Sequence, residues 1–276
     1  MSFPIEYNFL QTAFLAGLLA SIGCGVMGSY VVVKRIGYLA GGISHSVLGG
    51  MGAAVFFGFS PLGGAVLAAL ASALVIGWIK LRWQTHEDTL IGAVWAIGMS
   101  IGVLFIARTP GYGTDLMGYL FGNILLVSRA QLWQILALDL LVIGMILAFY
   151  RQFLAISFDE EFARLRDIPV SFFYLLFLCL VALTVVLLVQ VVGLILVIAL
   201  LTLPAATAGH HVQTLGRMMV LAAGLGMAFT SGGIGLSYAL DLPSGPVIIL
   251  LAGGGFLLSA AVSEWRRRQR ARAVSG

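Results

Sequence analysis

The sequence predicts an all-α protein: a polytopic bundle of transmembrane helices that forms a single domain over residues 1–276. Three observations lead to this fold class. Hydrophobic residues make up 61% of the chain, charged residues make up only 9%, and the apolar residues gather in long stretches. A soluble domain of this composition would have too little polar surface, whereas a helix of about 20 apolar residues can cross a bilayer. We therefore expect a multi-pass protein of the cell membrane that contacts lipid.

The apolar stretches define the expected helices in order. Charged or turn-forming residues separate one stretch from the next. The stretches cover residues 9–33, 41–58, 61–79, 89–107, 131–150, 171–209, 218–238 and 246–263. A bilayer core of about 30 Å needs about 20 residues of helix, so all but one of these stretches fit a single crossing.

The stretch 171–209 is too long for a single crossing. Its 39 residues would form a helix of about 58 Å, about twice the thickness of the bilayer core. We expect the helix to break or fold back at residues 190–193, which gives nine spans. An eight-span arrangement stays open as an alternative if a segment such as the glycine-rich region 109–123 enters and leaves by the same face.

The distribution of basic residues favours nine spans. With nine crossings, thirteen of the fifteen Lys and Arg residues fall on one side of the membrane, and only Arg108 and Arg129 fall on the other. The positive-inside rule assigns the richer side to the cytoplasm. The segment 157–169 and the basic tail 264–276 are then cytoplasmic. Most of the positive charge thus serves to anchor the spans, and we do not expect nucleic acid as a partner.

Several sequence motifs of soluble enzymes are missing from the chain. There is no HExxH, no Walker A sequence and no Cys/His cluster with zinc-finger spacing. We therefore expect a protein that is not an enzyme and holds no permanently bound cofactor.

The segment 157–169 concentrates charged residues between two spans. Asp159 and the two glutamates after it stand near an expected helix start, whereas Arg164 and Arg166 stand near its end, which complements the helix dipole. Pro169 would close this short helix. A charged, exposed helix of this kind suits contact with a partner protein.

An apolar stripe is expected on the same short helix. Phe158, Phe162 and Leu165 recur at helical spacing, so that they would share one face. Such a face either anchors a partner, as exposed aromatic residues commonly do, or packs back on the protein itself.

Six short motifs occur in order along nearly the whole chain. They are Lys34-Arg35 before Ser44-His45, Asp88-Thr89-Leu90-Ile91-Gly92, Asp115-Leu116-Met117-Gly118-Tyr119-Leu120-Phe121-Gly122, Phe158-Asp159 before Phe162-Ala163, Leu203-Pro204-Ala205-Ala206-Thr207-Ala208 and Leu242-Pro243-Ser244-Gly245-Pro246. In this order they resemble the recurrent stretches of permease subunits of ABC-type zinc and manganese importers, the ABC-3 family.

The resemblance implies a type II ABC importer-like permease that acts as a homodimer or as a close pair of related permeases. It implies ATP-driven import of a divalent transition metal, with zinc as the first expectation and manganese or iron as alternatives. Cytoplasmic ABC ATPase subunits would hydrolyse the ATP, and an extracytoplasmic metal-binding protein would deliver the metal. The resemblance also assigns contacts with the ATPase to one set of residues in 157–169. These are Phe158, Asp159, Phe162, Ala163, Leu165 and Arg166.

His45 is the leading candidate for a metal ligand in the pathway. Imidazole binds Zn(II), Mn(II) and Fe(II), and an ionisable group inside a span is costly unless it serves a pathway. The resemblance supports this role, because the family carries His at this place; the alternative is a neutral histidine bonded to a neighbouring helix. The family usually has Asp four residues earlier and often Asp after its Leu-Phe-Gly run, where this chain has Gly41 and Asn123. These two departures keep a permease for a metal chelate or another small solute as an alternative.

Three acidic residues are further candidates for a metal pathway. Asp139 stands near the middle of the span 131–150, where a carboxyl group suggests function. Asp115 and Asp241 fall in loops assigned to the outer face, where they could attract a cation or simply be solvated. So few buried acids argue against the other transporter class that we considered, an ion-coupled secondary transporter.

His210 and His211 are adjacent residues at the end of the stretch 171–209. Consecutive residues of a helix point about 100° apart, which makes joint binding of one ion difficult. We expect these histidines to lie at the cytoplasmic end of a helix and to cap its carbonyl groups.

Overall fold

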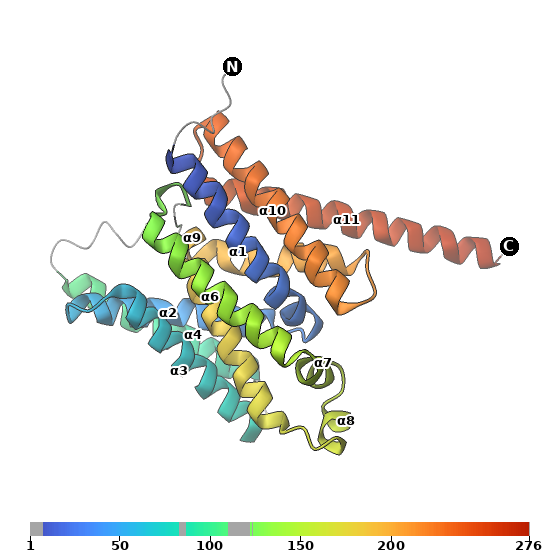
Figure 1. Cartoon of the computed structure of the whole chain (residues 1–276), viewed down its shortest axis with the longest axis horizontal. Helices are drawn as coiled ribbons and strands as arrows, with labels where there is room; N and C mark the ends of the chain where they lie inside the picture. The colour runs from blue at the N-terminus through green and yellow to red at the C-terminus, as the bar shows by residue number, and fades with distance from the viewer. Residues whose placement is uncertain (1–7, 83–86, 110–121, 123, 276) are drawn as a thin grey trace.

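The computed structural model describes residues 8–82, 87–109, 122 and 124–275 of the chain. Within these residues the fold is a helical bundle without strands (Figure 1). The described residues contain nine helical segments that are long and apolar enough to cross a membrane, two of which belong to one long helix with a break inside it. The predicted fold class is thus confirmed, and the nine-span arrangement is the one that the structure supports.

The helices follow the apolar stretches closely. They are α1 (Asn8–Val33), α2 (Gly37–Phe56), α3 (Pro61–Arg82), α4 (Glu87–Arg108), the 3-10 helix η2 (Ile124–Leu126), α6 (Arg129–Ala148), α7 (Tyr150–Phe158), α8 (Glu160–Leu165), α9 (Val170–Gly209), α10 (Leu215–Leu240) and α11 (Ser244–Ser275). The largest differences concern α2 and α11. Helix α2 starts at Gly37 rather than at residue 41, because Arg35 adopts a left-handed conformation with φ of 57° that turns the chain at once.

Helix α9 is broken where the sequence predicts a break. Gly193 lies inside the range 190–193 and has φ of 77° and ψ of 170°, a conformation that other residues rarely adopt. Gly122, also with positive φ, packs directly against the backbone at this position. The two parts of α9 on either side of Gly193 run in different directions in Figure 1, and each is long enough to cross the membrane on its own.

Helices α1 and α9 form the centre of the bundle. Helix α1 packs against α9, α10 and α6, and its Tyr30 makes edge-to-face ring contacts with Phe153 and Phe177. All three aromatic side chains are fully buried. Helices α4 and α11 lie at the periphery, where apolar side chains such as Leu104 and Leu250 stay exposed. The exposed apolar side chains of these peripheral spans fit contact with lipid.

Glycine residues let the helices around α2 approach closely. A Cβ atom at Gly49 would lie 2.6 Å from the carbonyl oxygen of Gly98, and one at Gly52 would lie 2.6 Å from that of Gly102. Helix α4 is therefore pressed against α2 with backbone in contact with backbone, a packing typical of membrane helices.

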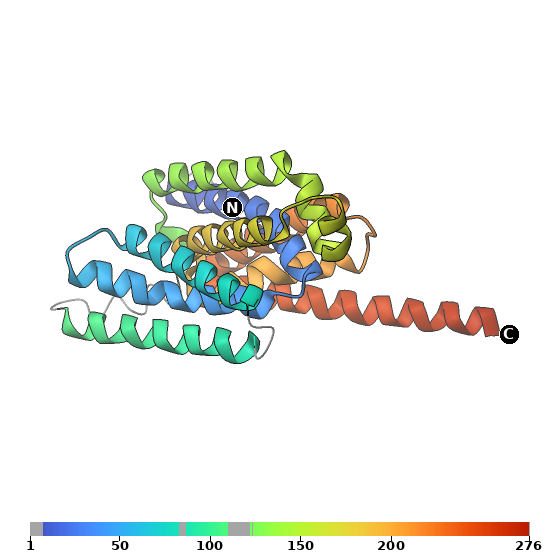
Figure 2. The same cartoon turned by 90° about the horizontal axis from the view of Figure 1, so that it is seen from below.

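Several helices end together at the end of the bundle that the basic residues predict to be cytoplasmic. The last turns of α11 project beyond the rest of the bundle on the side where α7 and α8 lie (Figures 1 and 2). Lys34 after α1 and Lys80 near the end of α3 both lie over the ring of Tyr174, with Nζ 5.6 Å and 5.5 Å from the ring centroid. The ends of α1 and α3 and the start of α9 thus meet at one end of the bundle.

Candidate functional site

His45 lies in the middle of α2, where the close approach of α4 brings Trp95 against it. The imidazole and indole rings are stacked, with centroids 4.2 Å apart and planes 5° from parallel. Within the described residues, the buried Nδ1 atom of His45 has no hydrogen-bond partner. A buried polar atom without a partner is destabilising unless water, an ion or another ligand completes it. The ring is thus held in place by stacking and keeps a nitrogen free for a ligand.

Trp95 is a residue of this site that the sequence analysis missed. Its indole Nε1 donates to the sulfur of Met99 at 3.0 Å, and its ring also lies 6.2 Å from that of Tyr38. Tyr38, Trp95 and His45 therefore form one aromatic group between α2 and α4. One signal could have indicated Trp95: it stands within a span rather than at the membrane interface, where tryptophan is enriched.

Gly41 stands one helical turn before His45 on the same face of α2. A Cβ atom at Gly41 would lie 3.0 Å from the Cδ1 atom of Ile198 in α9. This position therefore offers His45 no carboxylate, and the described residues contain no group of three or more His, Cys, Asp or Glu side chains that could hold a metal ion. Among the described residues, His45 is therefore not a member of a group of three or more such side chains.

Asp139 occupies a separate polar position between α6 and α1. Its side chain is 4% exposed, one carboxylate oxygen lies against Gly23 of α1, and Oδ2 has no hydrogen-bond partner among the described residues. Helix α6 packs against α1 and α9, whereas His45 faces α4. The structure therefore does not bring Asp139 and His45 into one site.

The two acidic loop candidates have different outcomes. Asp241 is exposed and ends α10 in a left-handed conformation with φ of 52°, and its backbone N–H donates to the carbonyl of Ser237. This arrangement fits a solvated helix end. Asp115, like Asn123, lies outside the described residues.

The segment 157–169 differs from the single helix that the sequence predicts. Asp159 caps α8, with its Oδ1 atom accepting a hydrogen bond of 2.9 Å from the backbone N–H of Phe162. Phe158 ends α7, so it does not share a helix with Phe162, and the expected three-residue helical stripe is wrong in this respect. Helix α8 also ends before the position expected from Pro169, which instead precedes α9. The cause is the cap, because an N-cap residue has extended rather than helical backbone.

The apolar side chains of this segment nevertheless stay exposed. Phe158 is 67% exposed, Phe162 48% and Leu165 84%, whereas Ala163 is fully buried against the bundle. The guanidinium of Arg166 lies over the Phe162 ring, 5.0 Å from its centroid. Ala163 therefore packs α8 against the rest of the bundle, and the exposed side chains remain available to a partner.

Lys34 joins α1 to this segment. Its Nζ donates to the carbonyl oxygen of Ile156 at 2.6 Å and pairs with Glu160 Oε1 at 3.1 Å. Burial lowers the pKa of Lys34, and the pairing with Glu160 opposes this shift. The motif and the charge distribution that include Lys34 do not predict this contact, because it depends on α7 and α1 meeting in space.

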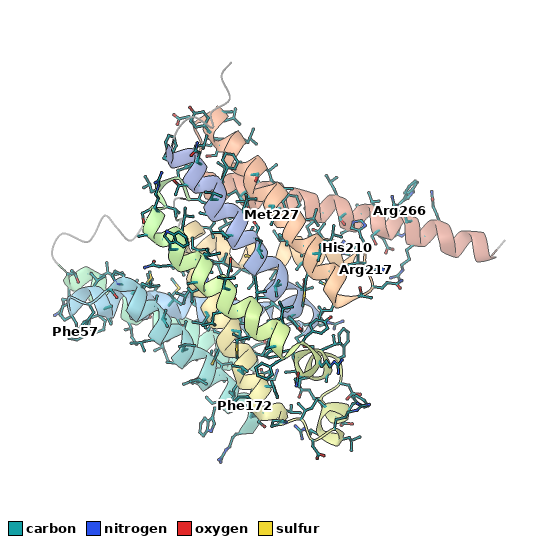
Figure 3. All side chains as sticks on the ribbon, in the orientation of Figure 1. Phe57, Phe172, His210, Arg217, Met227 and Arg266 are labelled. Carbon is teal, nitrogen blue, oxygen red and sulfur yellow. The ribbon has the colours of Figure 1, made fainter. Side chains whose placement is uncertain are left out.

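A cavity of about 490 Å³ opens beside the same end of the bundle. Val33 at the end of α1, Phe158 of α7, the turn between α9 and α10 with His210, and Phe256 of α11 contribute to its wall. Phe57 follows the last residue of α2, and Figure 3 shows it far from His210 and Arg217. Because Phe158 is part of the cavity wall, the cavity and the exposed side chain of Phe158 belong to one face of the protein.

Comparison with known proteins gives matches along most of the chain. Residues 6–263 match the ABC 3 transport family. An uncharacterized membrane protein of Synechocystis sp. is 46% identical over 93% of this chain and 92% of its own length. The manganese transport system membrane protein MntC of Halalkalibacterium halodurans is 35% identical, with 98% of this chain and 95% of MntC covered. A chain in the structure of PsaBC from Streptococcus pneumoniae in complex with Fab is 31% identical, with a TM-score of 0.84 and coverage of 92% of this chain and 91% of that one.

Proposed function

The chain belongs to the ABC 3 transport family of multi-pass membrane permeases, and we propose that it imports a divalent transition metal into the cytoplasm, driven by ATP. The observation that carries the metal pathway is His45. Its ring is fixed by Trp95 in a membrane span, and its buried Nδ1 atom has no partner within the described residues. A nitrogen ligand presented in this way suits a borderline metal ion.

Zinc is the metal that we propose first. Imidazole suits Zn(II) well, whereas Mn(II) prefers carboxylate and carbonyl oxygen ligands. The position one turn before His45 is Gly41, which supplies no oxygen ligand from a side chain. Manganese is the second candidate, and the name of the relative MntC as a manganese transport system protein favours it.

The exposed side chains of α7 and α8 form the proposed contact with a cytoplasmic ATPase. Phe158, Phe162 and Leu165 offer apolar anchors, and Asp159 and Arg166 hold the short helix and the Phe162 ring in place. The pairing of Lys34 with Glu160 and with the carbonyl of Ile156 would pass movements of this segment to α1. A permease homodimer with two ATPase subunits and an extracytoplasmic metal-binding protein completes the proposed importer.

The orientation follows from the meeting of basic residues at one end of the bundle. Lys34, Lys80 and the segment 157–169 lie there together, and the positive-inside rule assigns that end to the cytoplasm. Asp241 then lies on the outer face, where it could attract a cation. Asp139 would act apart from His45, as a buried carboxyl group between α1 and α6.

Metal uptake by cells with and without the gene tests this function. We expect deletion to lower uptake of one metal among Zn(II), Mn(II) and Fe(II) at submicromolar concentration, and the wild-type gene to restore it. Loss of Mn(II) uptake alone would move the assignment from zinc to manganese. Unchanged uptake of all three ions, with lower uptake of a chelated metal, would establish the alternative substrate class.

A further inference from the structure

We propose that His210 and His211 together form a second binding site for a divalent transition metal, between the end of α9 and α11. The proposed metal pathway through His45 does not include this pair. The inference rests on the proposed function only for the assignment of this face to the cytoplasm.

The two imidazoles converge on one point. His210 Nδ1 and Ser259 Oγ are 3.0 Å apart, and His211 Nε2 and the same Oγ atom are 2.9 Å apart. Both ring nitrogens therefore lie within hydrogen-bond distance of the same hydroxyl group, which can donate one hydrogen bond and accept others. Two imidazole nitrogens around one point are the ligand type that Zn(II) and similar ions prefer.

Adjacent histidines can reach one hydroxyl group here because they use different ring nitrogens. Helix α9 ends at Gly209, and His210 is the C-cap with helical backbone, φ of −71° and ψ of −20°. His210 contributes the nearer ring nitrogen, Nδ1, whereas His211 lies in the following turn and contributes the more distant Nε2. The backbone N–H groups of the two histidines donate to the carbonyls of Thr207 and Ala208. The backbone thus completes the cap, which leaves both rings free to point toward α11.

Helix α11 holds the rings from the other side. Phe256 and Ser259 stand three residues apart, which puts them on the same face of this helix. The ring of His210 is stacked on that of Phe256, with centroids 5.5 Å apart and planes 26° from parallel. One histidine is therefore oriented by an aromatic contact, whereas the exposed ring of His211 can rotate by the small amount that metal ligation at about 2.0–2.1 Å requires.

The position of the pair allows access for an ion. Both histidines are exposed, and His210 also lines the cavity that Phe158 and Val33 border. Under the proposed orientation this is the face from which imported metal leaves the protein. A metal bound here would tie the end of α9 to α11, next to the segment proposed to contact the ATPase.

Zinc binding by the purified full-length permease tests the site. The protein carries an affinity tag without histidine and is stripped of metal, and bound Zn(II) is measured by equilibrium dialysis. Every variant carries His45→Ala, so that the pathway ligand does not contribute. The variants compared are His45→Ala alone, His45→Ala with His210→Asn and His211→Asn, and His45→Ala with Ser259→Ala.

We expect His45→Ala alone to bind one Zn(II) per chain, and the variant lacking both histidines to bind it at least about tenfold more weakly. Asparagine keeps a polar side chain that can bond Ser259, so the fold should persist, and a single size-exclusion peak checks this. Ser259→Ala removes the hydroxyl but keeps both imidazoles, and it should retain binding.

Two results would overturn the site: no Zn(II) bound by His45→Ala alone, or equal binding with and without His210 and His211. Loss of binding with Ser259→Ala but not with the histidine variants would also contradict it. None of these measurements involves transport, so failure of the site and failure of the proposed import function are separate outcomes.

Discussion

The α2–α4 pair leaves a buried polar atom without a partner, whereas the α7–α8 segment leaves apolar side chains exposed. Between α2 and α4, glycine backbones touch and Trp95 covers His45, but the Nδ1 atom of His45 has no partner among the described residues. In the α7–α8 segment, Asp159 accepts a hydrogen bond from a backbone N–H group and Glu160 pairs with Lys34. The apolar side chains of Phe158 and Leu165, by contrast, are exposed.

This difference indicates what each region binds. A buried polar atom without a partner in an apolar environment can bind an ion or another polar ligand. Apolar side chains that are exposed on a polar segment can pack against the surface of a second protein. The first region therefore fits the proposed metal pathway, and the second fits the proposed contact with the ATPase.

Removal of the exposed aromatic side chains should give the largest effect on the second region. The double substitution Phe158→Ala and Phe162→Ala is expected to lower co-purification of the ATPase at least about tenfold, because anchors of this type each contribute about 2 kcal/mol or more to binding. Uptake should fall in parallel. The amount of ATPase recovered with the tagged permease measures the effect.

A matched control is Phe172→Ala, since Phe172 is also exposed, at 59%, but belongs to the start of α9. It should leave ATPase recovery close to that of the wild type. Full ATPase recovery and uptake with the Phe158/Phe162 double variant would show that α7 and α8 are not the docking surface.

The link between the α7–α8 segment and α1 should give a smaller effect. Lys34→Met removes a charge-assisted bond to the carbonyl of Ile156, and such bonds contribute about 1.5–3 kcal/mol. We expect uptake to fall about three- to tenfold while ATPase binding is largely retained. Glu160→Gln is the matched control, because this half-exposed partner forms an ion pair worth at most about 1 kcal/mol. Equal effects of the two variants would show that the bond to Ile156 has no separate role.

An added carboxylate near His45 should give the smallest effect and sharpen the metal assignment. Gly41→Asp places an oxygen ligand one turn from His45, and it requires a small displacement of the Ile198 side chain. We expect metal affinity to rise about threefold, with a larger gain for Mn(II) than for Zn(II), because carboxylate oxygen suits Mn(II). Gly41→Asn, of the same size but neutral, is the control. If Asn and Asp have the same effect on affinity, residue 41 does not face the metal.

The order and the breaks of the spans could be predicted from the sequence for physical reasons. Apolar length sets the number of crossings, and the excess length of residues 171–209 requires the break that Gly193 provides. The cap at Asp159 was also visible in the sequence. It should have excluded Phe158 from the following helix, because an N-cap residue interrupts helical backbone.

The remaining contacts could not be predicted because they depend on helices that are far apart in the sequence. The stacking of Trp95 on His45 requires the close approach of α4 to α2 that Gly49 and Gly98 allow. The contact of His210 and His211 with one hydroxyl group depends on the packing of α11, which brings Ser259 to the end of α9. Periodicity identifies neither the partner helix nor the last residue of a helix.

ATP-driven metal uptake into proteoliposomes that contain the permease with its ATPase tests the central claim most directly. We expect His45→Ala to lower uptake about a hundredfold with ATPase binding unchanged, because it removes the nitrogen ligand from an apolar path. Ser46→Ala is the control on the same helix: it removes only a hydroxyl group bonded to the carbonyl of Ile43, and it should transport like the wild type. Wild-type uptake by His45→Ala would contradict the metal pathway through α2.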